Sequence, residues 1–317
     1  MNETMSDISI TDMRAMLKDF MNDLQAKATN VAVPGIPTGF QPLDNLIGGF
    51  KKGKVYVIGS RPCMGKEEFM LSMIIDIIME SRLSVLMFST SHLKPDYIQR
   101  LMTIYCDIPV MHLVSGQLDV YEWERLDKGA TAWKNAPLFM HDSLDLPLDE
   151  LMETARNVIK ERGVKIIFID CLQMIDFAKG DDNPSERIAK VMLSLKQLAH
   201  QTEVPIVVGS MLNRGVEYRE GIEGKQPQLM DLANSSYVEG FADVVMLVHR
   251  PDYYHIYQDD YGRDLRRKIE IVVKKNGFKP SGSIFLEYHQ DTGVVAVVKN
   301  TNKAVEKLIK TFDLEEY

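Results

Sequence analysis

One short segment has the residue types of a phosphate-binding loop. It lies between an apolar, strand-like run at 54–60 and a helix-like run at 66–80. In the pattern GxxxxGK[ST], backbone N–H groups and a helix N-terminus hold phosphates, the lysine reaches the outer phosphates and the hydroxyl binds Mg²⁺. The chain keeps Gly65 and Lys66 of this pattern. The residues predicted to bind the nucleotide are Ser60, Arg61, Pro62, Cys63, Met64, Gly65, Lys66 and Glu67.

The last position of this loop departs from the pattern. Glu67 stands where a Ser or Thr hydroxyl would bind Mg²⁺. A carboxylate there adds negative charge beside the outer phosphates, and two like charges a few ångströms apart repel by roughly 1–4 kcal/mol. Glu67 could instead bind the metal directly, or it could simply favour the start of a helix. None of these restores the hydroxyl, so we expect ATP and Mg²⁺ as the ligands and impaired hydrolysis.

The elements that position this loop are strand-like runs that alternate with helix-like runs. The strand-like runs lie at 54–60, 84–90, 164–175, 204–212, 242–250, 268–275 and 282–289. The helix-like runs lie at 66–80, 95–105 and 185–201. Continuous apolar strands alternating with helices indicate an α/β fold with a mostly parallel, twisted sheet and helices on both faces. We expect the last two strand-like runs to be an antiparallel extension.

A helix with an apolar face is predicted to precede this domain, over 8–28. Asp12 could cap it, and its apolar positions recur at helical spacing: Ile10, Met13, Met16, Leu17, Phe20, Met21 and Leu24. A linker rich in proline and glycine follows. The apolar face must be buried, either on its own domain or on a neighbouring copy. We therefore divide the chain into a helix and linker at 1–35, a main domain at 36–300 and a helical tail at 301–317.

Composition limits the function classes. A net charge of -8 over 317 residues does not indicate a nucleic-acid binder, although a ring-shaped motor can hold DNA with a few inward-facing loops. Cys63, Cys106 and Cys171 are scattered, which argues against a disulfide framework or a zinc site and fits a reducing cytosol. The longest apolar run, 69–79, is too short to cross a bilayer. We expect a cytoplasmic protein without a membrane partner.

Several motifs, in order and over roughly 36–290, resemble the C-terminal motor domain of DnaB-family replicative helicases. They are RPCMGK, IIFIDCLQMI, MLNRGVEYR, FADVVMLVHRPDYY and KKNG. The resemblance implies a RecA-like P-loop NTPase core that works as a hexamer and translocates on single-stranded DNA with ATP. It also implies that the N-terminal helix docks on the adjacent subunit. We expect the family's N-terminal primase-interacting domain to be missing.

The resemblance assigns roles around the nucleotide, and several positions have changed. Asp170 matches the Walker B aspartate, a catalytic and Mg²⁺-binding position. Ser91 stands at the catalytic glutamate, Met211 at the glutamine that senses the γ-phosphate, and Lys275 at an arginine supplied to the neighbouring subunit's nucleotide. A serine is a poor base, and loss of a general base typically removes roughly 10²–10⁴ in rate. His92 is a conceivable substitute.

The resemblance also assigns DNA contacts. Arg214 and Arg219 lie in the family's DNA-facing loop region, whereas Ala233 replaces an arginine that contacts the DNA backbone. A further basic run, 263–268, is open to two interpretations, a solvated loop or an anion contact. Tyr253, Tyr254 and Tyr257 could stack on bases or cover a sheet edge.

Three hypotheses follow, and the sequence leaves open whether the chain is an enzyme. The first is a DnaB-like pseudoenzyme that binds nucleotide and assembles with itself or with a true DnaB helicase. The second is an active DNA helicase with a relocated base, His92 or Glu68. The third is an interaction module that binds a replication partner through the 8–28 helix or through a C-terminal face formed by Val305, Leu308, Ile309 and Phe312.

Overall fold

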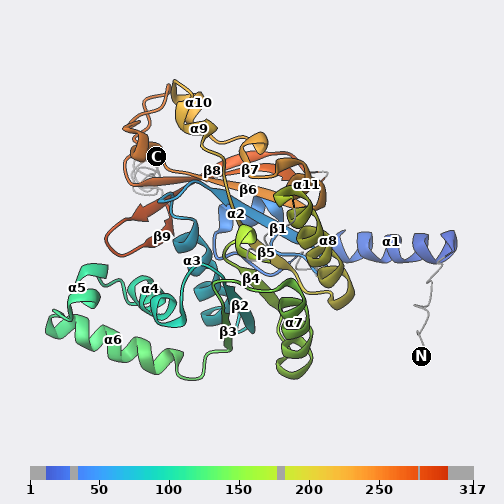
Figure 1. The fold of residues 1–317 in the computed structure, drawn as a ribbon, viewed down its shortest axis with the longest axis horizontal. Coiled ribbons are helices and arrows are strands. Elements are labelled where there is room, and N and C mark those ends of the chain that lie inside the picture. The colour runs from blue at the N-terminus through green and yellow to red at the C-terminus, as the bar shows by residue number, and fades with distance from the viewer. Residues whose placement is uncertain (1–11, 29–34, 177–182, 278, 299–317) are drawn as a thin grey trace, which may run out of the picture.

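A nine-stranded sheet in the order β3-β2-β4-β5-β1-β6-β7-β8-β9 runs through the domain (Figure 1). The structure is a computed structural model that describes residues 12–28, 35–176, 183–277 and 279–298. The strands are β1 (Val55–Ser60), β2 (Val85–Ser89), β3 (Leu138–Asp142), β4 (Ile166–Ile169), β5 (Ile206–Met211), β6 (Val244–His249), β7 (Lys268–Asn276), β8 (Gly282–His289) and β9 (Val294–Val297). Strands β1 to β6 are parallel and β7 to β9 are antiparallel, which confirms the predicted α/β sheet and its extension.

Helices cover both faces of this sheet, as predicted (Figure 1). The α-helices are α1 (Met13–Ala28), α2 (Gln41–Ile47), α3 (Lys66–Met79), α4 (Lys94–Cys106), α5 (Val110–Ser115), α6 (Val120–Trp133), α7 (Leu148–Arg162), α8 (Pro184–Thr202), α9 (Gly215–Tyr218), α10 (Ile222–Lys225) and α11 (Ser235–Phe241). Alternate residues of β1 point to opposite faces, because the side-chain period of a strand is two. Tyr56 and Ile58 pack in the cluster with α2, α3 and α4, whereas Val55 and Val57 pack in the cluster with α7, α8 and α11.

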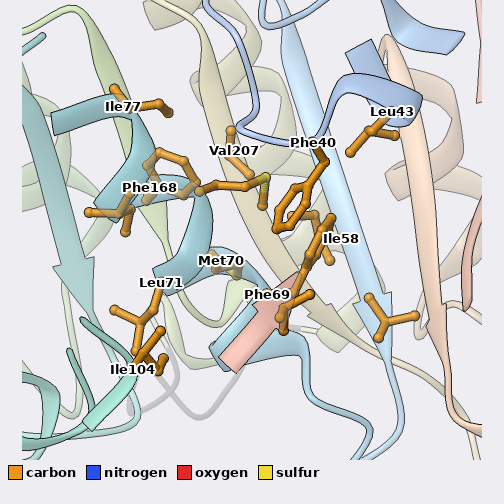
Figure 2. Packing of buried hydrophobic residues seen from close by; sticks show 14 of the residues in the cluster. Phe40, Leu43, Ile58, Phe69, Met70, Leu71, Ile77, Ile104, Phe168 and Val207 are labelled. Carbon is orange, nitrogen blue, oxygen red and sulfur yellow. The ribbon is translucent and has the colours of Figure 1, made fainter. Parts of the chain in front are cut away.

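The core anchors the helix that follows the predicted phosphate loop. Phe69 of α3, Phe168 of β4 and Val207 of β5 are fully buried in the same cluster (Figure 2). The ring of Phe40 stacks on that of Phe69, with centroids 5.3 Å apart. Because these contacts hold Phe69, they fix the first turns of α3 and therefore the position at which the phosphate loop ends.

One predicted strand is shorter than expected. The apolar run 164–175 predicted a single strand, but β4 ends at Ile169 and a 3₁₀ turn, η1 (Leu172–Met174), follows. The interruption lies at Asp170, whose side chain is buried and accepts hydrogen bonds from the neighbouring loop. The apolar residues after Asp170 are therefore buried as a turn, which hydropathy alone does not distinguish from a strand.

The predicted N-terminal helix is present as α1. Asp12 caps it, since its Oδ1 accepts a hydrogen bond of 2.8 Å from the backbone N–H of Ala15. The apolar side chains on α1 are exposed: Met13, Met16, Leu17, Phe20, Met21 and Leu24. Residues 8–11 and the predicted tail at 301–317, with its apolar face, lie outside the described residues. None of the helices in the described ranges is long and apolar enough to cross a membrane.

Candidate nucleotide site

The predicted phosphate loop joins the end of β1 to the start of α3. Gly65 precedes α3 with φ of 86°, a left-handed conformation that favours glycine. A Cβ there would also lie 3.0 Å from Cδ1 of Ile269, a tight contact that adds to the backbone preference for glycine. The first N–H groups of a helix have no acceptor within the helix, and they are available to an anion.

A pocket of about 390 Å³ opens at this loop. Its lining comes from segments that follow β1, β2, β4 and β5, because parallel strands have their carboxyl ends at one edge of a sheet. All eight residues predicted to bind the nucleotide line it, and Glu68, Ser91, His92, Arg100, Cys171 and Met211 complete it. The structure thus brings the predicted loop together with the catalytic-glutamate and sensor positions. Binding itself stays a prediction.

Three basic side chains hold or line the loop in different ways. The Nζ of Lys66 donates to the backbone carbonyl of Asp170 at 3.1 Å, which keeps the amine at the pocket. Arg61 turns away: its Nε donates to Oε1 of Glu217 at 2.8 Å, so its charge is paired with α9. Arg250, which the sequence patterns did not single out, donates from Nη1 to the carbonyl of Cys63 at 3.1 Å and supports the loop.

Asp170 is enclosed by hydrogen-bond donors. Its Oδ1 accepts from the backbone N–H of Thr90 at 2.8 Å and from the Thr90 hydroxyl at 2.7 Å. Its Oδ2 accepts from the Tyr97 hydroxyl at 2.8 Å and from the hydroxyl and N–H of Ser91 at 3.1 and 3.3 Å. A carboxylate offers about four lone pairs, and here they are filled by the protein. Burial first, and then the Asp170 carboxylate, raises the pKa of Tyr97 well above its usual value, so Tyr97 is a donor.

The Mg²⁺ that the motif implies does not fit these residues. The carboxylate of Asp170 has its lone pairs occupied, and Glu67 replaces the hydroxyl ligand. The carboxylate of Glu67 is itself bound, since its Oε2 accepts from Nη1 of Arg100 at 2.6 Å. The expected metal role of Asp170 is therefore not supported by the geometry.

Arg100, on α4, is the centre of a charged network that the sequence patterns did not predict. Besides Glu67, it contacts Oε1 of Glu68 and Nε2 of His92, both at 3.4 Å from its guanidinium. His92 also lies 4.0 Å from Oε2 of Glu67. Burial first, and then the neighbouring Glu67 carboxylate, raises the pKa of Glu68. Arg100 approaches Glu67 because α4 packs beside α3, a contact that no local sequence pattern indicates.

Met211 stands at the position that the resemblance assigns to a γ-phosphate sensor, and its side chain has no hydrogen-bond donor. Met211 lines the pocket and is exposed, and a thioether cannot donate a hydrogen bond to a phosphate. Gln173 of the IDxLQ motif bonds instead to β5, donating to the Ser210 hydroxyl at 2.9 Å and accepting from the N–H of Met211 at 3.1 Å. Gln173 therefore fixes the end of β5 rather than contacting the pocket.

Lys275 does not join this pocket. It lies on β7 opposite Val245, near the start of β6, whereas the pocket lies at the other end of the parallel strands. Its Nζ donates to the carbonyl of Glu239 at 2.6 Å. Within one chain Lys275 and Asp170 are not brought together, so the predicted catalytic role of Lys275 is limited to the nucleotide of a neighbouring chain.

The predicted DNA-contacting arginines differ in availability. Arg214 is exposed at the start of α9. Arg219 is bound internally, its Nη2 lying 2.5 Å from Oδ2 of the buried Asp231. In the basic run, Arg263 and Arg266 pair with Asp259 and Asp264, which favours a solvated loop over an anion contact.

The predicted tyrosines pack on neighbouring rings. Tyr254 stacks on His249 and contacts Tyr253 edge to face. Tyr257 contacts His255 through its hydroxyl, at 3.1 Å from Nδ1. These contacts favour the interpretation that the tyrosines cover local structure over that of base stacking.

A phosphate loop at the carboxyl end of a central parallel strand, with an aspartate at the end of β4, defines a P-loop domain of the RecA-like class. The match to known families is specific within that class. Residues 35–295 match the family described as DnaB-like helicase C terminal domain, and the chain belongs to that family.

Similar proteins agree with this assignment. The chain is 28% identical over 306 residues to the replicative DNA helicase DnaC of Bacillus subtilis, covering 96% of the chain and 63% of that protein. It is 29% identical over 282 residues to the replicative DNA helicase DnaB of Geobacillus stearothermophilus, covering 89% of the chain and 58% of that protein. The chain thus spans about 60% of the length of these curated relatives.

Solved structures show the same fold. One of them, described as an ATPase domain, superposes with a TM-score of 0.81 at 24% identity, covering 92% of this chain and 100% of that one. A DnaB-like replicative helicase, solved in a study of its interactions with primase, gives a TM-score of 0.79 at 24% identity and covers 92% of this chain and 68% of that one.

Proposed function

We propose that this chain is a DnaB-like motor domain that acts in DNA replication or its regulation, binds a nucleotide and hydrolyses it poorly. One observation carries the proposal. The phosphate loop keeps Gly65 and Lys66 at an open pocket of about 390 Å³, while the groups needed for hydrolysis around that pocket are replaced or engaged. Nucleotide binding needs the phosphate loop with Gly65 and Lys66, whereas turnover needs the groups that activate water and bind the γ-phosphate.

The binding part of the proposal rests on the loop and the start of α3. Backbone N–H groups of residues 61 and 63–67 and the Lys66 amine would hold the phosphates. Cys63, at the loop, has φ of 63°, a conformation that places successive loop N–H groups in a curved arrangement suited to anions. Poor hydrolysis is proposed for three reasons. The Ser91 hydroxyl is bound to Asp170, Met211 has no group that orients water, and the Asp170 carboxylate is enclosed by donors.

Lys66→Ala is expected to weaken ADP binding by about tenfold to a hundredfold. In the P-loop motif, the lysine amine is the side chain that reaches the outer phosphates. A hydrogen bond to a charged group contributes about 1.5–3 kcal/mol to binding, which corresponds to this loss of affinity. Isothermal titration of ADP into the wild-type chain and the variant measures this. Lys52→Ala, at an exposed lysine paired with Glu203, is the control and should bind as wild type. Equal affinities for all three chains would argue against binding at this loop.

The proposed partners are further copies of this chain, in a ring that could be hexameric, or a true DnaB helicase. The exposed apolar face of α1 supports this, because six apolar side chains in a row on a helix are usually buried in an interface. Single-stranded DNA is a further proposed partner, for which the exposed Arg214 is the available contact. Arg219 remains part of that prediction only if it leaves Asp231.

Phe20→Asp together with Leu17→Asp is expected to abolish self-association or association with a DnaB helicase. Both side chains are exposed on α1, so the substitutions remove apolar contact area without disturbing the core. Light scattering of the chain alone, and mixed with a DnaB helicase, gives the assembled mass. Lys18→Asp on the same helix is the matched control for added negative charge. A wild-type chain that stays monomeric and binds no helicase would contradict the proposal.

A further inference from the structure

We propose that this site binds the phosphates of a nucleotide without Mg²⁺, with the guanidinium of Arg100 in the electrostatic role that the metal has in other P-loop sites. The inference rests on the nucleotide binding proposed above. It concerns a residue, Arg100, that lies outside the phosphate-loop motif and reaches the pocket from a different helix.

The first step is the position of the Arg100 charge. In the P-loop pattern, the residue after the lysine supplies the hydroxyl that binds the metal. Here that residue is Glu67, and its Oε2 lies 2.6 Å from Nη1 of Arg100. A cation is therefore present within one hydrogen bond of the side chain at the metal-binding position. Because this cation is a side chain of α4, the site carries a positive charge at this position without binding a metal ion.

The second step is that Arg100 has donors left for an anion. A guanidinium carries five N–H groups in a planar fork that suits phosphate oxygens. Its described contacts involve Nη1 and Nη2, with Glu67, Glu68 and His92. Its side chain is 35% exposed and lines the same pocket as Lys66. Arg100 can thus keep part of its network and still bind a phosphate.

The third step is that the metal has poor alternatives in this pocket. Asp170 accepts hydrogen bonds from Thr90, Ser91 and Tyr97, and a carboxylate with filled lone pairs does not hold the waters of Mg²⁺. Arg61 is paired with Glu217 and adds no free charge to the pocket. Lys66 and Arg100 are the basic side chains of the pocket that remain to neutralise the phosphates, and the carboxylates of Glu67 and Glu68 oppose them.

The fourth step separates two roles that Arg100 could have. It could contact phosphate directly, or it could only neutralise the carboxylates of Glu67 and Glu68, which both lie within 3.4 Å of its guanidinium. Glu67→Gln together with Glu68→Gln removes both carboxylate charges, so an arginine that only neutralises them has no effect on binding in that background. A direct contact persists in both backgrounds, and a double-mutant cycle distinguishes the two roles.

The experiment is isothermal titration of ADP into the full chain, in excess MgCl₂ and in EDTA at equal ionic strength. Wild-type affinity is expected to agree between the two conditions within about threefold. Arg100→Gln is expected to weaken binding about tenfold or more, both alone and in the Glu67→Gln, Glu68→Gln background, since a charge-assisted bond is lost. Arg156→Gln, on the exposed side of α7, is the matched control and should bind as wild type. Urea unfolding of each variant verifies that it is folded.

Two outcomes would overturn this inference while leaving nucleotide binding intact. One is wild-type affinity that rises about tenfold or more with Mg²⁺. The other is an Arg100→Gln substitution without effect in the Glu67→Gln, Glu68→Gln background, which would limit Arg100 to neutralising these two carboxylates. Absence of ADP binding in both conditions would instead overturn the proposed function itself.

Discussion

Asp170→Asn is expected to lower the free energy of unfolding by about 3 to 5 kcal/mol. The carboxylate is buried and accepts from at least two groups on each oxygen, among them the Thr90 N–H and the Tyr97 hydroxyl. An amide replaces one acceptor oxygen with a donor, so donors on that side lose their partner. Each buried, unsatisfied donor costs about 1–3 kcal/mol, and the lost charge weakens the remaining bonds.

Urea denaturation followed by circular dichroism measures this loss. Tyr97→Phe removes one donor and should cost about 1 kcal/mol. Asp127→Asn, at an exposed position on α6, is the matched control and should change stability by less than about 0.5 kcal/mol. If Asp170→Asn were as stable as the control, the hydrogen bonds to the Asp170 carboxylate would not be important for stability. The carboxylate would then be available to another ligand, which would contradict its enclosure by donors.

The rate of ATP hydrolysis is expected to lie roughly 10²–10⁴-fold below about 1 s⁻¹, which is the lower end of typical enzyme turnover rates. Ser91 stands where the resemblance places the catalytic glutamate, and because its hydroxyl donates to Asp170 we expect no role for it as a base. Met211 offers no hydrogen bond to the γ-phosphate. Ser91→Glu alone should not restore turnover, because Met211 and the Glu67–Arg100 pair are unchanged.

A colorimetric assay of phosphate release, with single-stranded DNA present, measures the rate. The Lys66→Ala variant gives the background from contaminating enzymes. Turnover near about 1 s⁻¹ or faster in wild type, and absent in Lys66→Ala, would contradict the impaired-hydrolysis proposal. It would favour an active helicase with a relocated base, with His92 as the first candidate because it lies within 4.0 Å of Glu67 in the same pocket.

The buried strands and the long helices could be predicted from sequence because their patterns are strong. Runs such as 54–60 and 242–250 became β1 and β6, since continuous apolar strands occur where both faces are covered. No element was predicted in the interval 106–163. Strand β3 is only partly buried along its length, and α6 buries only Glu122 and Gly129, so neither has a clear buried face. Helix α7 was missed although its buried residues recur at helical spacing: Leu148, Leu151, Met152 and Ala155.

The phosphate loop could be predicted for a similar reason, because local spacing determines it. The network around Arg100 could not, since α4 meets α3 through tertiary packing and no spacing in the sequence links residue 100 to residue 67. The same limit applies to Asp170: a motif names the residue, but only the structure gives the donors on Thr90 and Tyr97 that occupy it. Arg219 is comparable, because its partner Asp231 lies across a loop.

The central claim is that the pocket holds a nucleotide and scarcely hydrolyses it. Isothermal titration of ATP into the wild-type chain, with single-stranded DNA present, tests both parts in one experiment. The account predicts saturable binding heat that returns to baseline after each injection. Continuous heat that corresponds to hydrolysis at about 1 s⁻¹ or faster would show turnover and would contradict the claim of poor hydrolysis. Absence of binding heat, together with a melting temperature of the protein that ATP does not change, would show that no nucleotide binds and would contradict the claim of binding.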